Sequence, residues 1–392
     1  MPQGSLAGLK VVDCSHVMAG AYCSMMLADL GADVIKVEPI GGEAGRGGRR
    51  TRFSGLDWVN RNKRAIAVDL RKPEGVELIR RLVGEADIFV ENFRPGVFDR
   101  LGLGYEDLRE LNPRLIYCSI SGFGHTGPYR ERGGFDLIAQ AVSGVMSYTG
   151  ETGATRPVAS GAPLADAGTA CFGALAILAA LQARHTTGVG QKVEATLVES
   201  SLSHAIWEAG LYLTTGEIAI PRGTRHRLAA PYEALKTADG FIVVGVNSED
   251  LWERLCDAVG LPELKADARF NTLKGRLANR DALEAALEAV LTQQPTDHWI
   301  ERFGDEGVPC GPVNDIGQAV EDPHIQARGL FQDVDGVRYL RTPVTMSETP
   351  VSIRGGAPAV GQHTREVLKE AGLPESQIAA LEADGVIQVA AG

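Results

Sequence analysis

The sequence lacks the features that mark membrane, disulfide-stabilised and nucleic-acid-binding proteins. Its apolar runs are broken well short of a membrane span, and its first ten residues, MPQGSLAGLK, contain no hydrophobic signal-peptide core. Its six cysteines are scattered without a CxxC pair, which in a chain of this length favours reduced thiols over disulfides or a zinc site. The formal net charge of −11 disfavours nucleic acid or an anionic membrane as a partner. We therefore expect a cytoplasmic protein without a bound metal.

Two phosphate-binding fingerprints are also missing. No GxGxxG opens a helix after a predicted strand, and GxxxxGK[ST] does not occur, so the dinucleotide and P-loop classes are disfavoured. What the chain does have is length and an ordinary globular composition. Its 392 residues, of which 44% are hydrophobic and 23% charged, are enough to build two or three domains with a sizeable core.

Short apolar segments alternate with helical patterns through the first half of the chain. Segments of strand type occur at Leu9–Asp13, Asp33–Glu38, Ala65–Leu70, Ile88–Glu91, Leu115–Ser119 and Gln191–Leu197. Helical patterns between them occur at His16–Leu30 and Pro73–Val83. Strands that alternate with helices predict βαβ units, and therefore an α/β fold with a doubly wound, Rossmann-like parallel sheet. Ligands of such sheets bind where the carboxyl ends of the strands lead into loops.

Glycine- and arginine-rich stretches adjoin several of these strands. They read PIGGEAGRGGRRTR, NRNKR, NFRPG and SGFGHTGP in chain order. Arginine forks bind phosphate oxygens in a bidentate manner and lysine acts as a point charge, so the loops together favour a phosphate-bearing ligand. For any single cation among Arg49, Arg50, Lys63 and Arg64, a solvated surface position is the alternative.

A long run of small and apolar residues follows Asp166 and extends to the punctuation TTGVGQ. Alanine and leucine recur in it at helical spacing, and Arg184 and His185 lie in its last turn, so the run predicts a buried helix. Asp166 then lies at or just before the N-terminus of this helix. One interpretation is an N-cap, because Asp is favoured there. The other is a carboxylate held ionised in an apolar setting and able to attack an electrophile.

The second half of the chain predicts a separate, smaller domain. Residues 214–230 are dense in Gly, Pro, Thr and Arg and predict a linker after a large domain at 1–213. A hairpin pattern turned at Ala238–Asp239–Gly240 opens an α+β domain at 231–325. Its predicted helices are Ser248–Val259, Asp281–Gln293 and Asp297–Glu306. Residues 326–392 are assigned to a return linker and the C-terminal part of the large domain, with two short helices separated at Gly372–Pro374.

Ordered segments along the whole chain resemble the family III CoA-transferases, a group that includes formyl-CoA:oxalate, carnitine and dicarboxylate CoA-transferases. The segments are LAGLKVVDCSHVMAGAYCSMMLADLGADVIKVEP, VNRNKRAIAVDLRKPEG, VENFRPGVFDRLGLGYEDL, YCSISGFGHTGPY, PLADAGTA, APYEALKTADGFIVVGV, GVPCGPVN and HTREVL. The resemblance implies a large domain built from both ends of the chain, a small domain inserted between them, and two subunits interlocked as a homodimer.

The resemblance also implies the chemistry. In this family an aspartate attacks the acyl-CoA thioester, forms a mixed anhydride, and is converted to an aspartyl-CoA thioester that the acceptor acid then resolves. Asp166, within PLADAGTA, matches that nucleophile. The dicarboxylate-using members are the most similar in the segments VNRNKRAIAVDL, LGYEDL and APYEALKTADGFIVVG. We therefore expect succinyl-CoA as donor, a short dicarboxylate as acceptor, and no cofactor beyond the coenzyme A thioester that is itself a substrate.

The remaining site residues are carried over position by position. The resemblance places the thioester end of the site at His16, Val17, Met18 and Ala19, adenine and phosphate contacts at Val68 and Arg71, the pantetheine and phosphate loop at Asn92, Phe93 and Arg100, and an acidic residue beside the site at Asp136. Core packing is the alternative for Val68 and Phe93, a surface charge for Arg100, and a turn for Asn92.

Several positions depart from the family pattern. Ala21 stands where many members have Pro, and Pro39 stands where some have a phosphate-binding Arg, so one of Arg46, Arg49 and Arg50 is expected to replace that contact. Gly133 stands where formyl-CoA transferase has a CoA-contacting Lys. That enzyme's glycine-rich closing loop has no counterpart between Thr214 and Pro231, which disfavours oxalate. Candidates for acceptor binding are Val17, Met18, Tyr22 and Tyr148 as lining, and Arg52, Arg222, Arg225 and Arg227 for a distal carboxylate.

Two other functions remain open from the sequence. An α-methylacyl-CoA racemase shares the fold but needs an Asp and a His as a pair of bases. The racemase His position is Phe135 here, and the nearby His125 lies in the GFGHTGP turn. The other alternative is a non-catalytic acyl-CoA-binding protein, which would bind coenzyme A without exchanging it.

Overall fold

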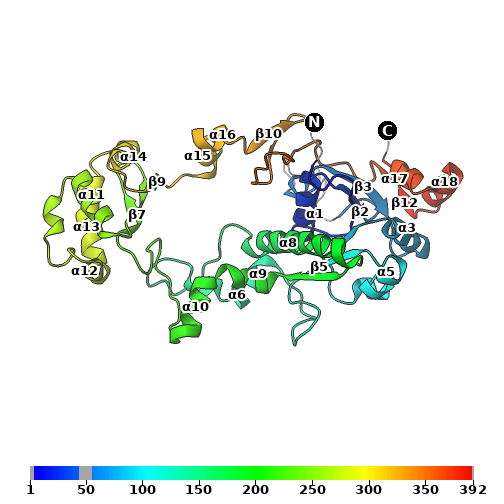
Figure 1. Cartoon of the computed structure of the whole chain (residues 1–392), viewed down its shortest axis with the longest axis horizontal. Coiled ribbons are helices and arrows are strands. Elements are labelled where there is room, and N and C mark those ends of the chain that lie inside the picture. The colour runs from blue at the N-terminus through cyan, green and yellow to red at the C-terminus, as the bar shows by residue number, and fades with distance from the viewer. Residues whose placement is uncertain (1–3, 44–54, 391–392) are drawn as a thin grey trace. The chain divides into compact units, whose positions relative to one another are not determined.

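The computed structural model describes residues 4–43 and 55–390, which form two compact units (Figure 1). The large unit comprises Met1–Val145, Ala159–Glu217 and Arg328–Gly392, and the small unit comprises Met146–Val158 and Ile218–Ala327. The small unit thus includes 146–158, which sequence analysis assigned to the large domain, and it begins before residue 231. A backbone hydrogen bond from Gly223 N–H to Gly150 O (2.9 Å) ties 146–158 to the segment expected to be a linker.

A seven-stranded sheet organises the large unit. Its order is β12 (Ile387–Gln388), β3 (Lys63–Val68), β2 (Asp33–Glu38), β1 (Lys10–Asp13), β4 (Ile88–Glu91), β5 (Ile116–Ser121) and β6 (Lys192–Thr196). All neighbours pair in parallel except β12, which pairs antiparallel with β3. The strand order 3-2-1-4-5-6 is that of a doubly wound sheet. The strands β1 to β3 are added toward one edge and β4 to β6 toward the other, so the order switches between β1 and β4. The predicted α/β fold is therefore confirmed.

Each face of this sheet is covered by its own layer of helices. Side chains alternate along the strands, so that Val11 and Val34 enter one core while Val12 and Ile35 enter the other. The first core lies under α1 (Ala19–Asp29) and α8 (Leu164–Thr187). The second lies under α3 (Pro73–Gly84), α4 (Val97–Arg100), α5 (Tyr105–Leu111), α17 (Thr364–Glu370) and α18 (Glu375–Ala383). The large unit also contains α2 (Gly55–Trp58), α6 (Asp136–Val142), α9 (Leu197–His204), α10 (Ile206–Thr215), β10 (Phe331–Val334) and β11 (Val337–Leu340), and α7 (Val145–Tyr148) lies at the boundary between the units.

Helix α8 is long and apolar enough to cross a membrane, by length and composition only, and it is the one such helix among residues 4–43 and 55–390. Half of its most apolar window is buried inside the protein. It packs along α1, β5 and β6, and Ala170, Ala174 and Ile177 enter the first core. The small residues let the helix approach the sheet closely, which accounts for its composition without a membrane.

The small unit has a sheet and a core of its own. Its antiparallel sheet has the order β7 (Tyr232–Lys236), β8 (Phe241–Gly245) and β9 (Cys310–Pro312). Its helical elements are α11 (Glu249–Val259), the 3₁₀ helix η1 (Pro262–Lys265), α12 (Leu273–Ala278), α13 (Arg280–Leu291), α14 (Thr296–Asp305), α15 (Ile316–Glu321) and α16 (Pro323–Ala327). Ser248 caps α11 by accepting a hydrogen bond from Leu251 N–H, at the predicted helix start.

Candidate active site

The two cavities that contain most of the predicted site residues lie next to the carboxyl ends of β1 and β4, where the strand order switches. One has a volume of about 200 Å³ and is lined by His16, Val17, Met18, Ala19, Asn92, Phe93, Ile120, Ser121, Gly122, Gly134, Phe135, Asp166 and Leu197. The other has a volume of about 420 Å³ and is lined by Cys14, His16, Val37, Glu38, Pro39, Ile40, Val68, Asp69, Leu70, Arg71, Phe93, Phe98 and Leu101. They share His16 and Phe93, whose rings meet edge to face with centroids 4.5 Å apart. We call them the Asp166 cavity and the Arg71 cavity.

Asp166 lies inside the first turn of α8, and the interpretation of Asp166 as an N-cap is wrong. The residue at the N-cap is Pro163, whose side chain cannot accept a hydrogen bond. Asp136, the first residue of α6, supplies the missing acceptor, because its Oδ1 accepts the N–H groups of Ala165 (2.7 Å) and Asp166 (3.1 Å). Gln140 Nε2 donates to the other oxygen of Asp136 at 2.7 Å. A second acidic residue thus satisfies the helix terminus and leaves the Asp166 side chain for the cavity.

The Asp166 carboxylate is set apart by its lack of partners. No hydrogen bond or ion pair to its oxygens occurs within the described part of the chain, although the residue is partly buried and lines the cavity. Burial, and secondarily the negative charge of Asp136, raises the pKa of Asp166 to about 6. The group is therefore ionised at neutral pH but weakly stabilised in that form, which suits a carboxylate that attacks an electrophile.

The loop between β1 and α1 has an uncommon backbone conformation at the cavity wall. Val17 has φ of +60° and its side chain is 59% exposed. A β-branched residue avoids this left-handed region, where such a conformation costs about 1–3 kcal/mol and persists only when its surroundings impose it. Two side chains impose it here. Glu43 Oε2 accepts the Val17 N–H at 2.8 Å, and the Asn92 amide accepts from His16 N–H and donates to His16 O, both at 2.7 Å.

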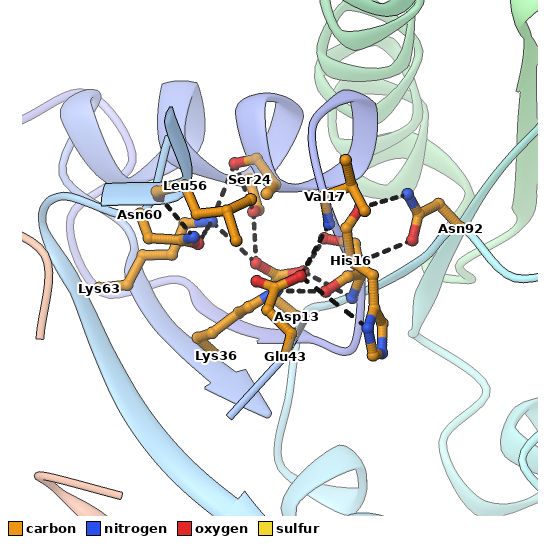
Figure 2. Close-up of polar contacts among 12 residues, drawn as sticks. Asp13, His16, Val17, Ser24, Lys36, Glu43, Leu56, Asn60, Lys63 and Asn92 are labelled. Atoms are coloured by element: carbon orange, nitrogen blue, oxygen red, sulfur yellow. Dashed lines mark hydrogen bonds and ion pairs between the residues drawn. The ribbon is translucent and has the colours of Figure 1, made fainter. Parts of the chain in front are cut away.

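Four charged side chains are buried together beneath this loop (Figure 2). The Lys63 ammonium donates to Asp13 Oδ2 at 3.0 Å, and Lys36 Nζ lies 3.4 Å from Glu43 Oε1 and donates to Ser15 O. Burial alone would raise the pKa of Asp13, but the neighbouring lysines and the hydroxyls of Ser15 and Ser24 hold it below its ordinary value. Burial lowers the pKa of Lys63 to about 8. The cluster balances two cations with two anions.

His16 joins this cluster to both cavities. Burial, and secondarily the positive charge of Lys36, lowers the pKa of its imidazole, which is therefore neutral at pH 7. Its Nδ1 lies 3.9 Å from Glu43 Oε2. The uncharged imidazole thus lines both cavities.

The structure brings most of the predicted site residues together. The Asp166 cavity collects the 16–19 segment with Asn92 and Phe93, and the Arg71 cavity adds Val68. Asp136 accepts hydrogen bonds from the N-terminal turn of α8 and lines neither cavity. Arg100 is exposed at the end of α4 and also lines neither cavity. Arg71 is exposed and its guanidinium pairs with Asp69 at 2.8 Å.

Some cations expected near a phosphate have structural partners instead. Lys63 belongs to the buried cluster, and Arg64 forms ion pairs with Asp33, Glu366 and Glu370. Both lysine and arginine lie at the amino end of β3, opposite the edge where ligands bind. The expectation that NRNKR contacts the ligand is therefore wrong. Arg46, Arg49, Arg50 and Arg52 lie outside the described residues.

The candidates for acceptor binding belong to different units of the structure. Tyr22 packs against the first core and lines neither cavity. Arg225 forms ion pairs with Glu233, Asp281 and Glu284 inside the small unit. Its guanidinium is thus committed to holding the 222–230 segment against β7 and α13. Tyr148, Arg222 and Arg227 also belong to the small unit.

Two functional candidates were missed by reasoning from the sequence. Glu43 lies in PIGGEAGRGGRRTR, where its carboxylate was overlooked among the arginines. Arg94 occupies the space beside Gly133, because a Cβ built at residue 133 would lie 3.0 Å from Arg94 Nη2. A cation therefore lies next to Gly133, which stands where formyl-CoA transferase has a CoA-contacting Lys. The motif NFRPG was included among the loops that favour a phosphate-bearing ligand, but Arg94 itself was not named as a site residue.

The second base of a racemase does not occupy its expected place. Phe135 is 72% exposed and lines the Asp166 cavity. His125 lines neither cavity, and its Nε2 lies 2.7 Å from Ser119 Oγ. Burial lowers the pKa of His125. The turn position predicted for this histidine agrees with these contacts.

Comparisons with known proteins identify the family. The model of CoA-transferase family III matches residues 6–364. A succinate–glutarate CoA-transferase of Agrobacterium fabrum is 37% identical over 381 residues, which are 93% of this chain and 95% of that protein. An acetyl-CoA:oxalate CoA-transferase of Acetobacter aceti is 37% identical over 385 residues, with coverage of 96% and 98%. The crystal structure of a CaiB/BaiF family protein from Brucella suis superposes with a TM-score of 0.87 at 38% identity, covering 95% of this chain and all of that one.

These matches extend over nearly the whole length of both partners and confirm the resemblance drawn from the sequence segments. The curated relatives are named as enzymes that exchange coenzyme A between acids, and the solved relative has the same α/β architecture. The chain therefore belongs to CoA-transferase family III and is an enzyme that transfers coenzyme A from an acyl-CoA to a free carboxylic acid.

Proposed function

We propose that the enzyme transfers coenzyme A from succinyl-CoA to a short dicarboxylic acid through covalent intermediates on Asp166. The observation that carries this proposal is the unpartnered Asp166 carboxylate in a cavity, with a pKa raised to about 6 by burial. A carboxylate is the nucleophile this reaction requires, because it must itself become an activated acyl group and then be regenerated. Serine or histidine cannot take that role.

The first half of the exchange consumes the donor. An Asp166 oxygen attacks the thioester carbonyl, the C–S bond breaks, and a mixed succinyl–aspartyl anhydride and the coenzyme A thiolate result. The thiolate then attacks the aspartyl carbonyl, so that free succinate leaves and an aspartyl-CoA thioester remains. No net proton is gained or lost. Met18 and Ala19 at the start of α1 line the same cavity, and no side chain caps the N-terminus of this helix, so its N–H groups are suited to stabilise the oxyanions formed at each step.

The second half mirrors the first with the acceptor acid. Its carboxylate attacks the aspartyl-CoA thioester, which releases the thiolate and forms a new mixed anhydride. The thiolate attacks the acceptor's acyl carbon, which yields the new acyl-CoA and restores Asp166. We assign the nucleotide end of coenzyme A to the Arg71 cavity, because this larger cavity adjoins the Asp166 cavity at His16 and Phe93. The names of both curated relatives contain a dicarboxylate, glutarate or oxalate, which supports that class of acceptor.

We further propose that the enzyme acts in the cytoplasm as a homodimer. All six cysteines are free thiols, which suits a reducing compartment. The large unit exposes large apolar side chains on neighbouring elements, namely Phe135, Leu137, Ile138 and Val142 at α6, Phe172 and Leu175 on α8, and Ile206, Trp207, Tyr212 and Leu213 on α10. Such a set exceeds the scattered apolar residues of a monomer surface and is typical of an interface between copies.

Intact-mass spectrometry tests the catalytic proposal. Wild-type enzyme incubated with succinyl-CoA should acquire a covalent coenzyme A adduct that hydroxylamine removes and that one member of a panel of dicarboxylic acids discharges. Asp166→Asn, which preserves the shape of the side chain, should form no adduct. Asp87→Asn, an acid bonded to Arg184 at the far end of α8, is the matched control and should form the adduct as wild type does.

The opposite results would exclude the proposal. An adduct that persists in Asp166→Asn would place the nucleophile elsewhere. No adduct with any donor, together with deuterium exchange at the α-carbon of a 2-methylacyl-CoA, would establish a racemase. Tight binding of coenzyme A thioesters with neither reaction would establish a binding protein.

A further inference from the structure

The contact between Glu43 and Val17 joins two loops of the large unit that are separate in sequence. Glu43 follows β2, 26 residues after Val17, and belongs to the same loop as Pro39 and Ile40, which line the Arg71 cavity. Its side chain is almost completely buried, and both of its oxygens face the buried cluster or the Val17 peptide. Figure 2 shows the carboxylate directed at the backbone of the 16–17 segment from below.

We propose that Glu43 is a positioning residue for the transfer reaction, which holds the Val17 peptide so that the start of α1 faces the Asp166 carboxylate. The proposal rests on the assignment of Asp166 as the nucleophile. Glu43 does not touch the reacting atoms. It acts through the backbone of the segment that lines the Asp166 cavity.

The geometry supports this role in two steps. Asn92, which follows β4, fixes the His16 peptide at both its N–H and its carbonyl group, and Glu43 fixes the next N–H along the chain. The two side chains therefore hold the peptide group between His16 and Val17 from its carbonyl and its N–H side, in the loop that leads into α1. Met18 and Ala19 come next, line the Asp166 cavity, and form the uncapped start of the helix.

The backbone conformation of Val17 shows why its N–H group needs the hydrogen bond to Glu43. Without a partner for its N–H, a valine would leave the left-handed region, since its branched Cβ is crowded there. The peptide between Val17 and Met18 would then rotate, and the N–H groups that follow would turn with it. Displacements of about 1 Å in a reacting site cost on the order of 100-fold in rate.

The charge of Lys36 explains why the residue that accepts the Val17 N–H is a carboxylate. The lysine is buried in β2 and donates to Ser15 O, so its charge requires a nearby anion. Glu43 Oε1 provides that anion at 3.4 Å, while Oε2 is left for the Val17 N–H. One side chain therefore neutralises the cluster and orients the loop.

Four variants test the proposal, with turnover measured per folded protein. Glu43→Ala should lower kcat about 100-fold and change KM for the acyl-CoA much less. Glu43→Gln retains an acceptor for the Val17 N–H and should lose only about 10-fold. Val17→Gly removes the crowding at positive φ. In the Val17→Gly background, Glu43→Ala should therefore cost about 10-fold or less. This non-additivity between the two substitutions is the signature that a purely structural role would not produce.

Asp29→Asn is the matched control, because Asp29 is also a buried carboxylate of the large unit, bonded to Arg61, and lines neither cavity. It should lower the melting temperature while leaving kcat of the folded enzyme within about twofold of wild type. Equal losses from Glu43→Ala in the wild-type and the Val17→Gly backgrounds would overturn the proposal, as would losses that follow the melting temperature in all variants.

The rate of adduct formation separates the two hypotheses. If wild type forms the Asp166 adduct and the Glu43 variants form it at the wild-type rate, the positioning role is wrong and the nucleophile stands. If wild type forms no adduct at Asp166, the proposed mechanism fails first. Slow adduct formation in folded Glu43→Gln, with normal binding of coenzyme A, supports both.

Discussion

Asp136 and Asp166 are neighbouring carboxylates with different environments. Asp136 accepts two backbone N–H groups and a side-chain amide, whereas no hydrogen bond to the Asp166 carboxylate occurs in the described residues. One acid is thus used to complete a helix terminus, and its charge disfavours ionisation of the other. The two acids therefore have different roles at the N-terminus of α8: Asp136, on α6, completes the helix terminus, and Asp166 is the proposed nucleophile.

The pH dependence of turnover should report this pair. Asp166 must be ionised to attack, so kcat/KM should fall as the pH drops through about 6, where Asp166 becomes protonated. Asp136→Asn removes the neighbouring negative charge and should move this acidic limb to lower pH, with a lower plateau if the N-terminus of α8 is less well held. Initial rates measured from acidic to neutral pH report the shift. An unchanged limb in Asp136→Asn would contradict the assigned coupling.

Asp166 should also destabilise the fold at neutral pH. Its pKa is raised in the folded state to about 6 from an ordinary 3.8, so the folded state binds the proton more tightly, and stability falls as the pH rises between about 4 and 6. Asp166→Asn should therefore be more stable than wild type at pH 7, by about 1–2 kcal/mol after allowing for partial exposure. Urea unfolding at neutral pH and at about pH 4 measures this, and the gain should vanish at the lower pH.

At the scale of elements, the C-terminal return is anchored to the large unit by a buried acid. Asp29, the last residue of α1, accepts hydrogen bonds from Arg61 before β3 and from Thr342 in the returning chain. Asn62 donates both to Asp29 and to Ser352 O. Three segments remote in sequence therefore meet at one carboxylate.

Asp29→Asn should destabilise the large unit by about 3–5 kcal/mol, because it leaves the buried Arg61 guanidinium without its counterion. Asp267→Asn removes the exposed pair with Arg269 and should cost far less, because solvent screens the two charges. Urea unfolding of the two variants compares a buried and an exposed ion pair in one protein. Similar costs for both would show that burial of the Asp29 pair contributes little.

The elements that could be predicted from the sequence are those whose pattern is local. Asp33–Glu38 and Ile88–Glu91 were predicted at their observed limits, and α11 begins one residue after its predicted start at Ser248. The helix predicted from His16 begins instead at Ala19, because Val17 has a left-handed backbone conformation. β12 was missed, because a two-residue strand exists only through pairing with β3, far earlier in the chain.

In the candidate site, too, local motifs could be predicted from the sequence and contacts between remote segments could not. Asp166 and the 16–19 segment could be predicted, since each belongs to a motif that is contiguous in sequence. The N-cap at Pro163 could not be predicted, because the acceptor for the helix terminus comes from Asp136 on another helix. The Glu43 contact depends on the path of a loop after β2, and loop paths follow from tertiary packing rather than from residue spacing. The roles of these residues stay predictions until the variants are measured.

At the scale of the whole molecule, the exposed apolar residues of α6, α8 and α10 predict self-association. Trp207→Glu and Leu213→Glu together should convert the proposed homodimer to a monomer, because a carboxylate cannot be buried in an apolar interface without a partner. Size-exclusion chromatography with light scattering measures the mass. Val337→Glu, at an exposed apolar residue of β11, is the control and should leave the mass unchanged. A monomeric wild type would contradict the proposal.

The pairing of β12 with β3 has a consequence for biosynthesis. β3 has buried side chains at Ala65, Ile66 and Ala67, and its outer edge pairs with β12, which is translated long after β3. While the ribosome is still elongating, the nascent large unit therefore carries an open, apolar strand edge, the kind of surface that pairs with other chains. Messages truncated before the codon for Ile387 would release a product with this edge permanently uncovered, and such a product should depend on chaperones to remain in solution.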